Sequence, residues 1–148
     1  MYKADQIANW FICRDDKNTD SDGISNLKIQ KLLYYAQGAS LALYDELLFM
    51  DELVAWEHGP VVVDLYHKYK EYGSAPIPAN DIDVSGIDND VADLLEDVYK
   101  FFGQYSAWKL RNMTHEEEPW KKTNSGETIQ IELIKQSFMD NYVEESEN

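Results

Sequence analysis

The amino-acid sequence predicts a mainly α-helical fold, a compact domain of about five to six helices around a central apolar helix, plus a short β-hairpin or extended segment. Apolar residues recur at helical spacing along most of the chain. The segment from Asn26 to about Tyr44 is apolar on several faces at once, which is typical of a helix at the centre of a globule. Sequence of strand character is short and lies mainly between Leu53 and Trp56.

The first helix is expected over residues 3 to 14, where one face carries Ala4, Ile7, Ala8 and Phe11. The polar stretch from Asp15 to Gly23 predicts a loop. It has the composition of a calcium-binding loop but lacks the glutamate that an EF-hand places at its twelfth position. Ser25 or Asn26 is expected to cap the central helix, which begins there.

The middle of the chain predicts a strand that turns sharply into a helix. Leu53 to Trp56 is expected to be extended, with Leu47 to Met50 as its plausible partner in a small hairpin. Gly59 permits unusual backbone angles and Pro60 suits the first turn of a helix. We therefore expect a helix that begins at this corner and ends at Gly73.

The second half of the chain predicts one long loop and three further helices. Pro, Gly and Asp residues mark Ser74 to Asn89 as a surface loop. A helix is expected from Asp90 to Phe102, followed by a short helix that Ser106 caps. The apolar face of the last helix comprises Ile131, Ile134, Phe138 and Tyr142.

Length, composition and charge limit the class of protein. The 148 residues suit a single domain, residues 1–148, with an acidic tail over residues 140–148. One cysteine, Cys13, the lack of an export signal and the lack of a long apolar run predict a cytoplasmic protein without a membrane segment. The net charge of −15 argues against direct nucleic-acid binding and favours solubility and capture of basic partners.

The residues that most often carry chemistry are not arranged in a catalytic motif. His58, His67 and His115 follow no metal-binding spacing, and His67 lies on a helix face with carboxylates, as on many solvated helices. Cys13 lies among apolar residues, which predicts a buried and inert thiol. The sequence has no phosphate loop, dinucleotide fingerprint or serine elbow. We therefore expect no catalytic residue, cofactor or metal, and no enzyme.

Tryptophan and histidine residues beside predicted turns allow two interpretations. They are Trp56, His58, Trp108, His115 and Trp120. Tryptophan is enriched at binding hot spots, which favours an interaction surface. Large aromatic side chains also dominate the energetics of protein cores, so a structural role remains open.

Four ordered motifs resemble a known family. They are Leu27 to Gly38, Ala55 to Val62, Tyr105 to Leu110, and Thr114-His115 followed by Pro119-Trp120. Together they resemble the Panacea domain family, also described as phage-associated GepA-like or SocA-like proteins. The resemblance extends over roughly residues 4–138.

The resemblance implies a helical domain of bacteria, phages and prophages that acts as an antitoxin. Such proteins neutralise a toxin encoded beside them by direct protein–protein binding, and one branch instead delivers its toxin to a protease as an adaptor. We expect one set of motif residues to bind the partner, namely Trp56, His58, Trp108, His115 and Trp120. We expect the other set to be structural, namely Gln30, Tyr34, Gly59, Pro60 and Pro119.

Two other functions compete with the antitoxin interpretation. The first is a phage-encoded acidic inhibitor that imitates nucleic acid and blocks a host defence or nucleic-acid-binding protein. The second is a hydrolase or metalloenzyme that uses His58, His67 or His115. The antitoxin interpretation itself leaves three mechanisms open: blockade of the toxin, reversal of its effect, or delivery to a protease.

Overall fold

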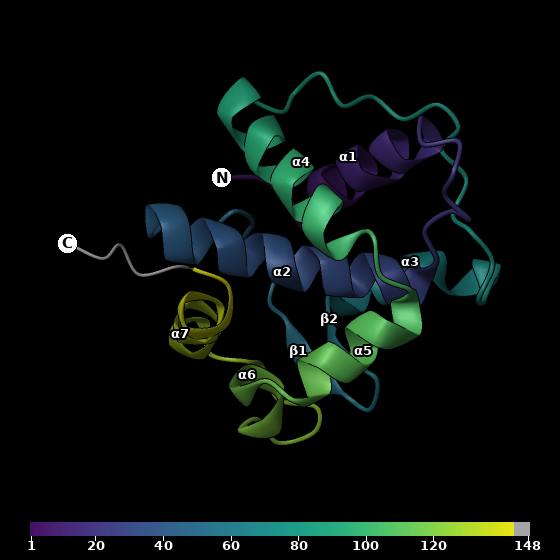
Figure 1. Ribbon diagram of the computed structural model, residues 1–148. Coiled ribbons are helices and arrows are strands. Elements are labelled where there is room, and N and C mark those ends of the chain that lie inside the picture. Colours follow the sequence, from purple (N-terminus) through teal and green to yellow (C-terminus); the bar gives the residue numbers. More distant parts are fainter. Residues whose placement is uncertain (144–148) are drawn as a thin grey trace.

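Helix α2 (Asn26–Tyr44) runs through the middle of the molecule in the computed structural model, which describes residues 1–143 (Figure 1). The other helices are α1 (Ala4–Asp16), α3 (Val63–Tyr69), the 3₁₀ helix η1 (Lys70–Tyr72), α4 (Asn89–Phe102), α5 (Ala107–His115), α6 (Glu118–Lys121) and α7 (Ile131–Tyr142). Strands β1 (Val54–Trp56) and β2 (Gly59–Val61) form one antiparallel hairpin. The predicted mainly helical class is thus confirmed.

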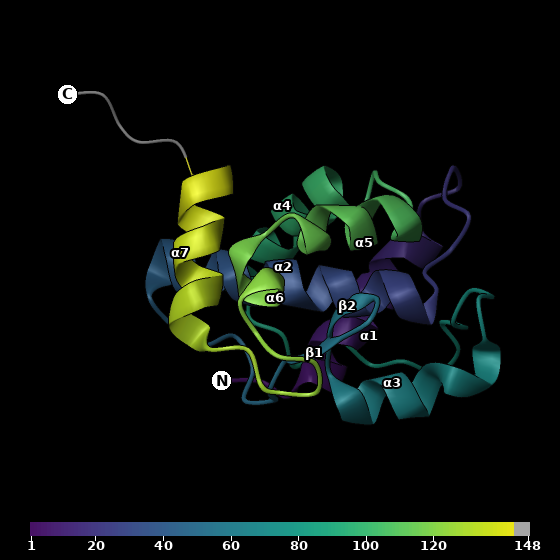
Figure 2. The ribbon, with the colours of Figure 1, turned by 90° about the horizontal axis from the view of Figure 1, so that it is seen from below.

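The elements lie on different sides of α2. Helices α1 and α4 lie on one side, whereas α5, α6 and the hairpin lie on the other (Figures 1 and 2). Helix α7 crosses near the C-terminal end of α2, and α3 lies beside its N-terminal half (Figures 1 and 2). This arrangement explains why nearly every face of α2 is apolar: each face meets a different neighbour.

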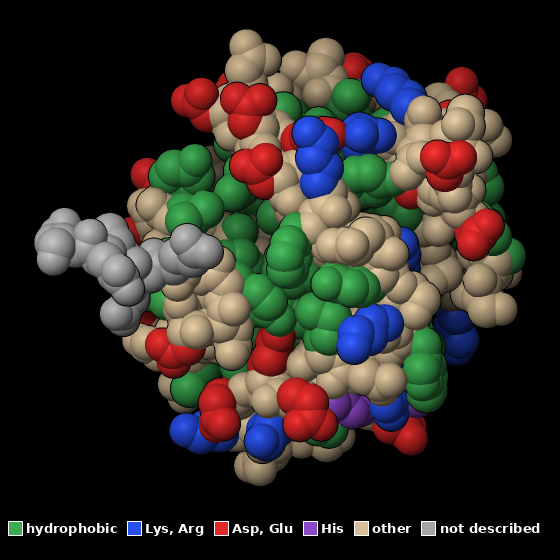
Figure 3. All heavy atoms as spheres, viewed as in Figure 1, with side chains coloured by type: hydrophobic (Ala, Val, Ile, Leu, Met, Phe, Trp, Pro, Cys, Tyr) green, Lys and Arg blue, Asp and Glu red, His purple; other side chains and the backbone are tan. Residues whose placement is uncertain are grey.

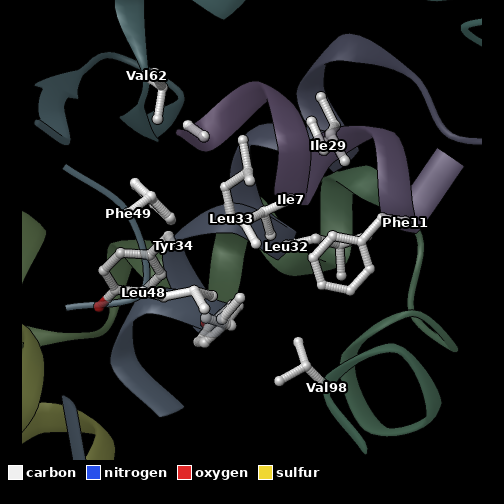
Figure 4. Close-up of a cluster of buried hydrophobic side chains, with 14 of the residues drawn as sticks. Ile7, Phe11, Ile29, Leu32, Leu33, Tyr34, Leu48, Phe49, Val62 and Val98 are labelled. Carbon is white, nitrogen blue, oxygen red and sulfur yellow. The ribbon is translucent and has the colours of Figure 1, made fainter. Parts of the chain in front are cut away.

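The core forms around the middle of α2. Figure 4 shows Leu32 and Leu33 of α2 among side chains from α1, from α4 and from the segment that precedes the hairpin. Leu32, Leu33, Ile7 and Phe11 are completely shielded from solvent. Burying a side chain of this size stabilises a fold by about 1.5–3 kcal/mol relative to exposure, so α2 supplies much of the hydrophobic driving force.

Two serines cap helices where the sequence predicts it. The Ser25 hydroxyl accepts a hydrogen bond from the Lys28 backbone N–H at 3.2 Å, and the Ser106 hydroxyl accepts one from the Lys109 N–H at 3.1 Å. Each cap satisfies an N–H group that the first turn of a helix leaves without a partner. The predicted beginnings of α2 and α5 are therefore confirmed.

The hairpin differs from the prediction in its partner strand. Val54 to Trp56 pairs with Gly59 to Val61, not with Leu47 to Met50, and Trp56 lies opposite Gly59 across a two-residue turn. Gly59 has a φ of +107°, and this conformation, which glycine tolerates, lets the chain reverse at once. Pro60 consequently lies in a strand, and the following helix begins at Val63.

Other departures are small and local. Helix α6 was not predicted, because it is only four residues long and begins beside Pro119. Cys13 is only partly buried, and this burial raises the pKa of its thiol. Residues 140–142 of the predicted acidic tail belong to α7, and residues 144–148 lie outside the described residues. No helix in the described part of the chain is long and apolar enough to cross a membrane.

Candidate partner-binding surface

The hairpin turn packs tightly against α2 and α5. A Cβ atom at Gly59 would lie 2.7 Å from the Thr114 hydroxyl oxygen and 2.8 Å from Cε of Lys31. Both distances are shorter than van der Waals contact, and Thr114 and Lys31 are completely buried. The left-handed backbone and the close approach therefore both require glycine here.

Two polar side chains of α2 hold the strand that leaves the turn. The Gln30 side-chain oxygen accepts a hydrogen bond from the Val62 N–H at 2.8 Å, and its amide nitrogen donates to Asn26. Lys31 donates from Nζ to the Pro60 carbonyl oxygen at 2.9 Å. Gln30 thus links α2 to the start of α3, and Lys31 links it to β2. These contacts give Gln30 and Pro60 structural positions.

Lys31 is an unusual cation because no carboxylate is paired with it in the described residues. Burial, and next the positive charge of Arg111, together lower its pKa from 10.5 to about 7. A neutral amine still donates to the Pro60 carbonyl, so the hydrogen bond does not need the charge.

A buried carboxylate connects α6 to the rest of the fold. Glu117 precedes α6, and its carboxylate accepts hydrogen bonds from the hydroxyls of Tyr34 and Tyr35, each at 2.9 Å, and of Tyr142. Burial raises the pKa of Glu117, and the three tyrosine hydroxyls oppose that shift because they stabilise the ionised form. Tyr34 therefore has a structural position. Pro119, which is buried in α6, has one as well.

His115 and Trp120 form a stacked pair between α5 and α6. Their ring centroids lie 3.8 Å apart with an angle of 5° between the planes. The Trp120 indole N–H donates to the Trp56 carbonyl oxygen at 2.7 Å, which joins α6 to β1. Burial, and next the charge of Arg111, lower the pKa of His115, so neutral imidazole is favoured. In the described structure, its Nε2 is buried and has no hydrogen-bond partner.

Trp108, Arg111 and His58 form a second, more exposed group. The Arg111 guanidinium lies 4.5 Å from the centre of the Trp108 ring, and its Nε donates to Nδ1 of His58 at 3.3 Å. The ring centroids of His58 and Trp108 lie 5.9 Å apart. Trp108 nevertheless leaves 55% of its surface exposed. Arg111 thus holds two exposed rings in a defined arrangement.

The five residues expected to bind a partner therefore lie on one side of the molecule, around the hairpin, α5 and α6. With Arg111 they define what we call the aromatic–histidine surface: Trp56, His58, Trp108, Arg111, His115 and Trp120. The side chain of Trp56 instead points toward α3, because its partly buried ring packs against Tyr66 of that helix with ring centroids 4.8 Å apart. Trp108 is the tryptophan of this surface most open to a partner.

Sequence reasoning missed Arg111, Lys31 and Glu117. Arg111 follows Trp108 by three residues on a predicted helix, so their spacing already places them on one face. Lys31 stands among apolar residues on a helix that has no exposed face, which signals a buried cation. No comparable signal marks Glu117, because it lies between two other glutamates.

A hollow of about 600 Å³ lies beside the stacked pair. Its lining includes Trp56, Glu57, Arg111, His115 and Trp120. No group of three or more His, Cys, Asp or Glu side chains within residues 1–143 is arranged to hold a metal ion. Aromatic faces, one guanidinium and a neutral histidine suit contact with another molecule's side chains.

The structure is thus that of a helical protein in which residues of α2 hold the hairpin and α6 in place, and these elements together with α5 carry a surface of aromatic and basic side chains. Residues 29–121 match the family model described as "Antitoxin SocA-like, Panacea domain". The chain belongs to this family. The match is shorter than the expected resemblance over residues 4–138, but it includes the hairpin, α5, α6 and most of α2. Searches of curated proteins and of solved structures gave no match.

Proposed function

We propose that this protein is an antitoxin that neutralises a partner toxin by direct protein–protein binding at the aromatic–histidine surface. The family supports the antitoxin role at the level of the domain. In this proposal the protein acts by occupancy and performs no reaction. Its partner is the protein encoded beside it, as the resemblance to other Panacea domain proteins implies.

The observation that carries the proposal is the exposed Trp108 held by Arg111. Tryptophan and arginine are the residue types most enriched at binding hot spots. An isolated exposed tryptophan is free to change rotamer, whereas the contacts with Arg111 and His58 restrict Trp108 before a partner arrives. Such preorganisation reduces the entropy lost on binding.

The charge around this surface differs from that of the whole chain. Residues 105–123 contain four basic residues and three acidic ones, although the chain carries a net charge of −15. One of the three acidic residues, Glu117, is buried. Exposed Glu57 in the hairpin turn offsets one of the basic residues. A partner therefore meets an aromatic face that is much less acidic than the chain as a whole, which suits apolar side chains.

The proposal is tested with Trp108→Ser and a control, Met50→Ser, at another exposed apolar residue. Both variants are co-expressed with the toxin from the neighbouring gene, and affinity is measured by calorimetry. We expect Trp108→Ser to weaken binding by about 2 kcal/mol or more, roughly 30-fold, and to reduce growth rescue. Met50→Ser is expected to match wild type. Equal affinities for the two variants would contradict the proposed surface.

A second candidate function is an acidic inhibitor of a nucleic-acid-binding protein. The net charge of −15 favours it, because a strongly acidic surface attracts the basic sites that bind phosphates. In that case duplex DNA competes with this protein for its partner. The antitoxin proposal expects no competition by DNA unless the toxin itself binds nucleic acid.

A further inference from the structure

A groove on another side of the molecule is apolar at its floor and acidic at its edge. Two adjoining hollows of about 520 and 530 Å³ share Leu94 and follow the C-terminal half of α2 and the length of α4. We call their combined surface the α2–α4 groove. Its apolar lining includes Leu43, Tyr44, Val91, Leu94, Val98 and Phe101.

Several of these apolar side chains are unusually open to solvent. Leu43, Tyr44 and Phe101 are each about half exposed. Figure 3 shows hydrophobic side chains gathered in this hollowed region, with carboxylates along its upper margin. Contiguous exposed apolar surface of this kind marks interaction sites.

The charged side chains at the edge of the groove all have the same sign. Five acidic side chains line it, namely Glu46, Asp88, Asp90, Asp93 and Asp97, and no Lys or Arg side chain within residues 1–143 does so. None of the five forms an ion pair with another described residue. These carboxylates are therefore available to a basic partner.

We propose that the α2–α4 groove binds a basic amphipathic helix, which presents apolar side chains to the floor and Lys or Arg side chains to the acidic edge. Helix α4 has 14 residues and is roughly 21 Å long, so a partner helix of similar length spans the groove. Amphipathic helices bind apolar grooves through anchors at i, i+3, i+4 and i+7.

The same charges disfavour two other occupants. A second copy of this chain would bring an equally acidic groove edge and a net charge of −15 to the contact. The residues that follow Val143 in the sequence include Glu144, Glu145 and Glu147, which match the sign of the groove edge. A basic segment of a different protein is the chemistry that complements the groove.

This inference rests on the proposed function in one respect: the basic helix belongs to the toxin. The toxin would then contact two surfaces of opposite character, the aromatic–histidine surface and the α2–α4 groove. Two linked contacts raise the overall affinity above that of either alone, provided that the geometry allows both.

The groove itself is tested without any toxin. A dye-labelled 14-residue peptide of leucine and lysine, with leucine at helical spacing, is titrated with the protein and followed by fluorescence anisotropy. A peptide with glutamate in place of lysine is the charge control. We expect the lysine peptide to bind and the glutamate peptide to bind at least 10-fold more weakly.

Variants locate the binding. Leu43→Ser with Asp97→Asn changes the groove, whereas Met50→Ser with Asp20→Asn makes similar changes at exposed residues outside it. We expect the groove variant to bind the lysine peptide at least 10-fold more weakly and the control within twofold of wild type. Asp90→Asn with Asp93→Asn removes charge without removing an apolar contact, so it provides a second groove variant if the first fails to fold.

The outcomes separate this inference from the proposed function. Equal binding of the peptide to groove and control variants, or no binding to wild type, would overturn the groove as a docking site. Growth rescue from the neighbouring toxin is then compared. If wild type rescues growth and both groove variants rescue it equally well, the toxin does not use the groove. If wild type does not rescue growth, the proposed function fails, while the peptide result still decides the groove.

Discussion

At the residue scale, Gly59 explains how a few side chains determine the position of the hairpin. Its positive φ allows the chain to reverse through a two-residue turn. Because glycine has no side chain, the turn packs directly against Lys31 and Thr114. The sequence predicts a sharp corner at this glycine and the following proline. It does not predict the strand after the corner, because proline is uncommon in β-strands and suits the first turn of a helix.

Gly59→Ala tests this role against a matched control. We expect it to lower the free energy of unfolding by about 3 kcal/mol, because backbone strain and overcrowding each cost roughly 1–3 kcal/mol. Gly73→Ala introduces the same atom where φ is also positive, +58°, but where nothing lies within 4 Å. That variant should lose less than Gly59→Ala, because only backbone strain, about 1–3 kcal/mol, contributes there. Urea denaturation measures both, and equal losses would mean that packing at Gly59 is unimportant.

Lys31 predicts a specific dependence of stability on pH. Its pKa in the folded protein, about 7, lies below 10.5, so the folded state holds fewer protons than the unfolded chain between these values. Stability should therefore increase with pH across this window, and the penalty should be complete below about pH 7. Lys31→Met removes the titrating group. The difference in unfolding free energy between wild type and Lys31→Met should favour wild type increasingly from pH 7 to 10, and parallel curves would contradict this assignment.

At the element scale, the positions of the helices can be predicted from the sequence, but the contacts between elements cannot. Apolar spacing and the capping residues Ser25 and Ser106 indicate where α1, α2, α4, α5 and α7 lie. These signals are local, within one or two turns of helix. The pairing of β1 with β2 and the attachment of α6 depend instead on contacts between distant residues. Glu117, which binds tyrosines of α2 and α7, is the clearest example.

Glu117→Ala should remove the hydrogen bonds that connect the start of α6 to α2 and α7. The change leaves three tyrosine hydroxyls without their acceptor, and a buried polar group without a partner costs about 1–3 kcal/mol. We expect a loss of about 3 kcal/mol or more in unfolding free energy. The exposed neighbour Glu116 provides the control, since Glu116→Ala should change stability by less than about 0.5 kcal/mol. A similar small effect at Glu117 would show that the tyrosine contacts contribute little.

The candidate surface was partly predictable at this scale. The resemblance selected five aromatic and histidine residues, and the fold brings them to the hairpin, α5 and α6. What the sequence did not distinguish is their exposure. Trp120 and His115 stack against each other and Trp120 bonds to β1, whereas Trp108 is open. Exposure depends on how α5, α6 and the hairpin pack together, which no single helix period determines.

At the scale of the whole molecule, charge is distributed unevenly over the surface. The α2–α4 groove is edged by carboxylates, and the segment with α5 and α6 carries a slight excess of basic residues. The sequence shows the overall acidity but not where the acidic residues meet on the surface. Only the fold shows that acids from the α2 end and from α4 meet along one groove.

Salt should affect the two surfaces differently. Attraction between the groove edge and a basic helix is screened by salt, whereas contacts made by Trp108 are mainly apolar and cation–π contacts. We expect binding of the leucine–lysine peptide to weaken at least 10-fold between 50 and 500 mM NaCl, measured by anisotropy. Affinity that does not depend on salt would show that the acidic edge contributes little.

The central claim is that this protein neutralises a toxin by stoichiometric binding through the surface that contains Trp108. The most direct measurement is co-expression of the tagged protein, as wild type and as Trp108→Ser, with the product of the neighbouring gene, scoring growth and the recovered complex together. We predict that wild type rescues growth and yields a complex of fixed stoichiometry, and that Trp108→Ser, while remaining folded, rescues growth less well and yields less complex. Growth rescue by wild type without any complex, or an undiminished complex with Trp108→Ser, would contradict the claim.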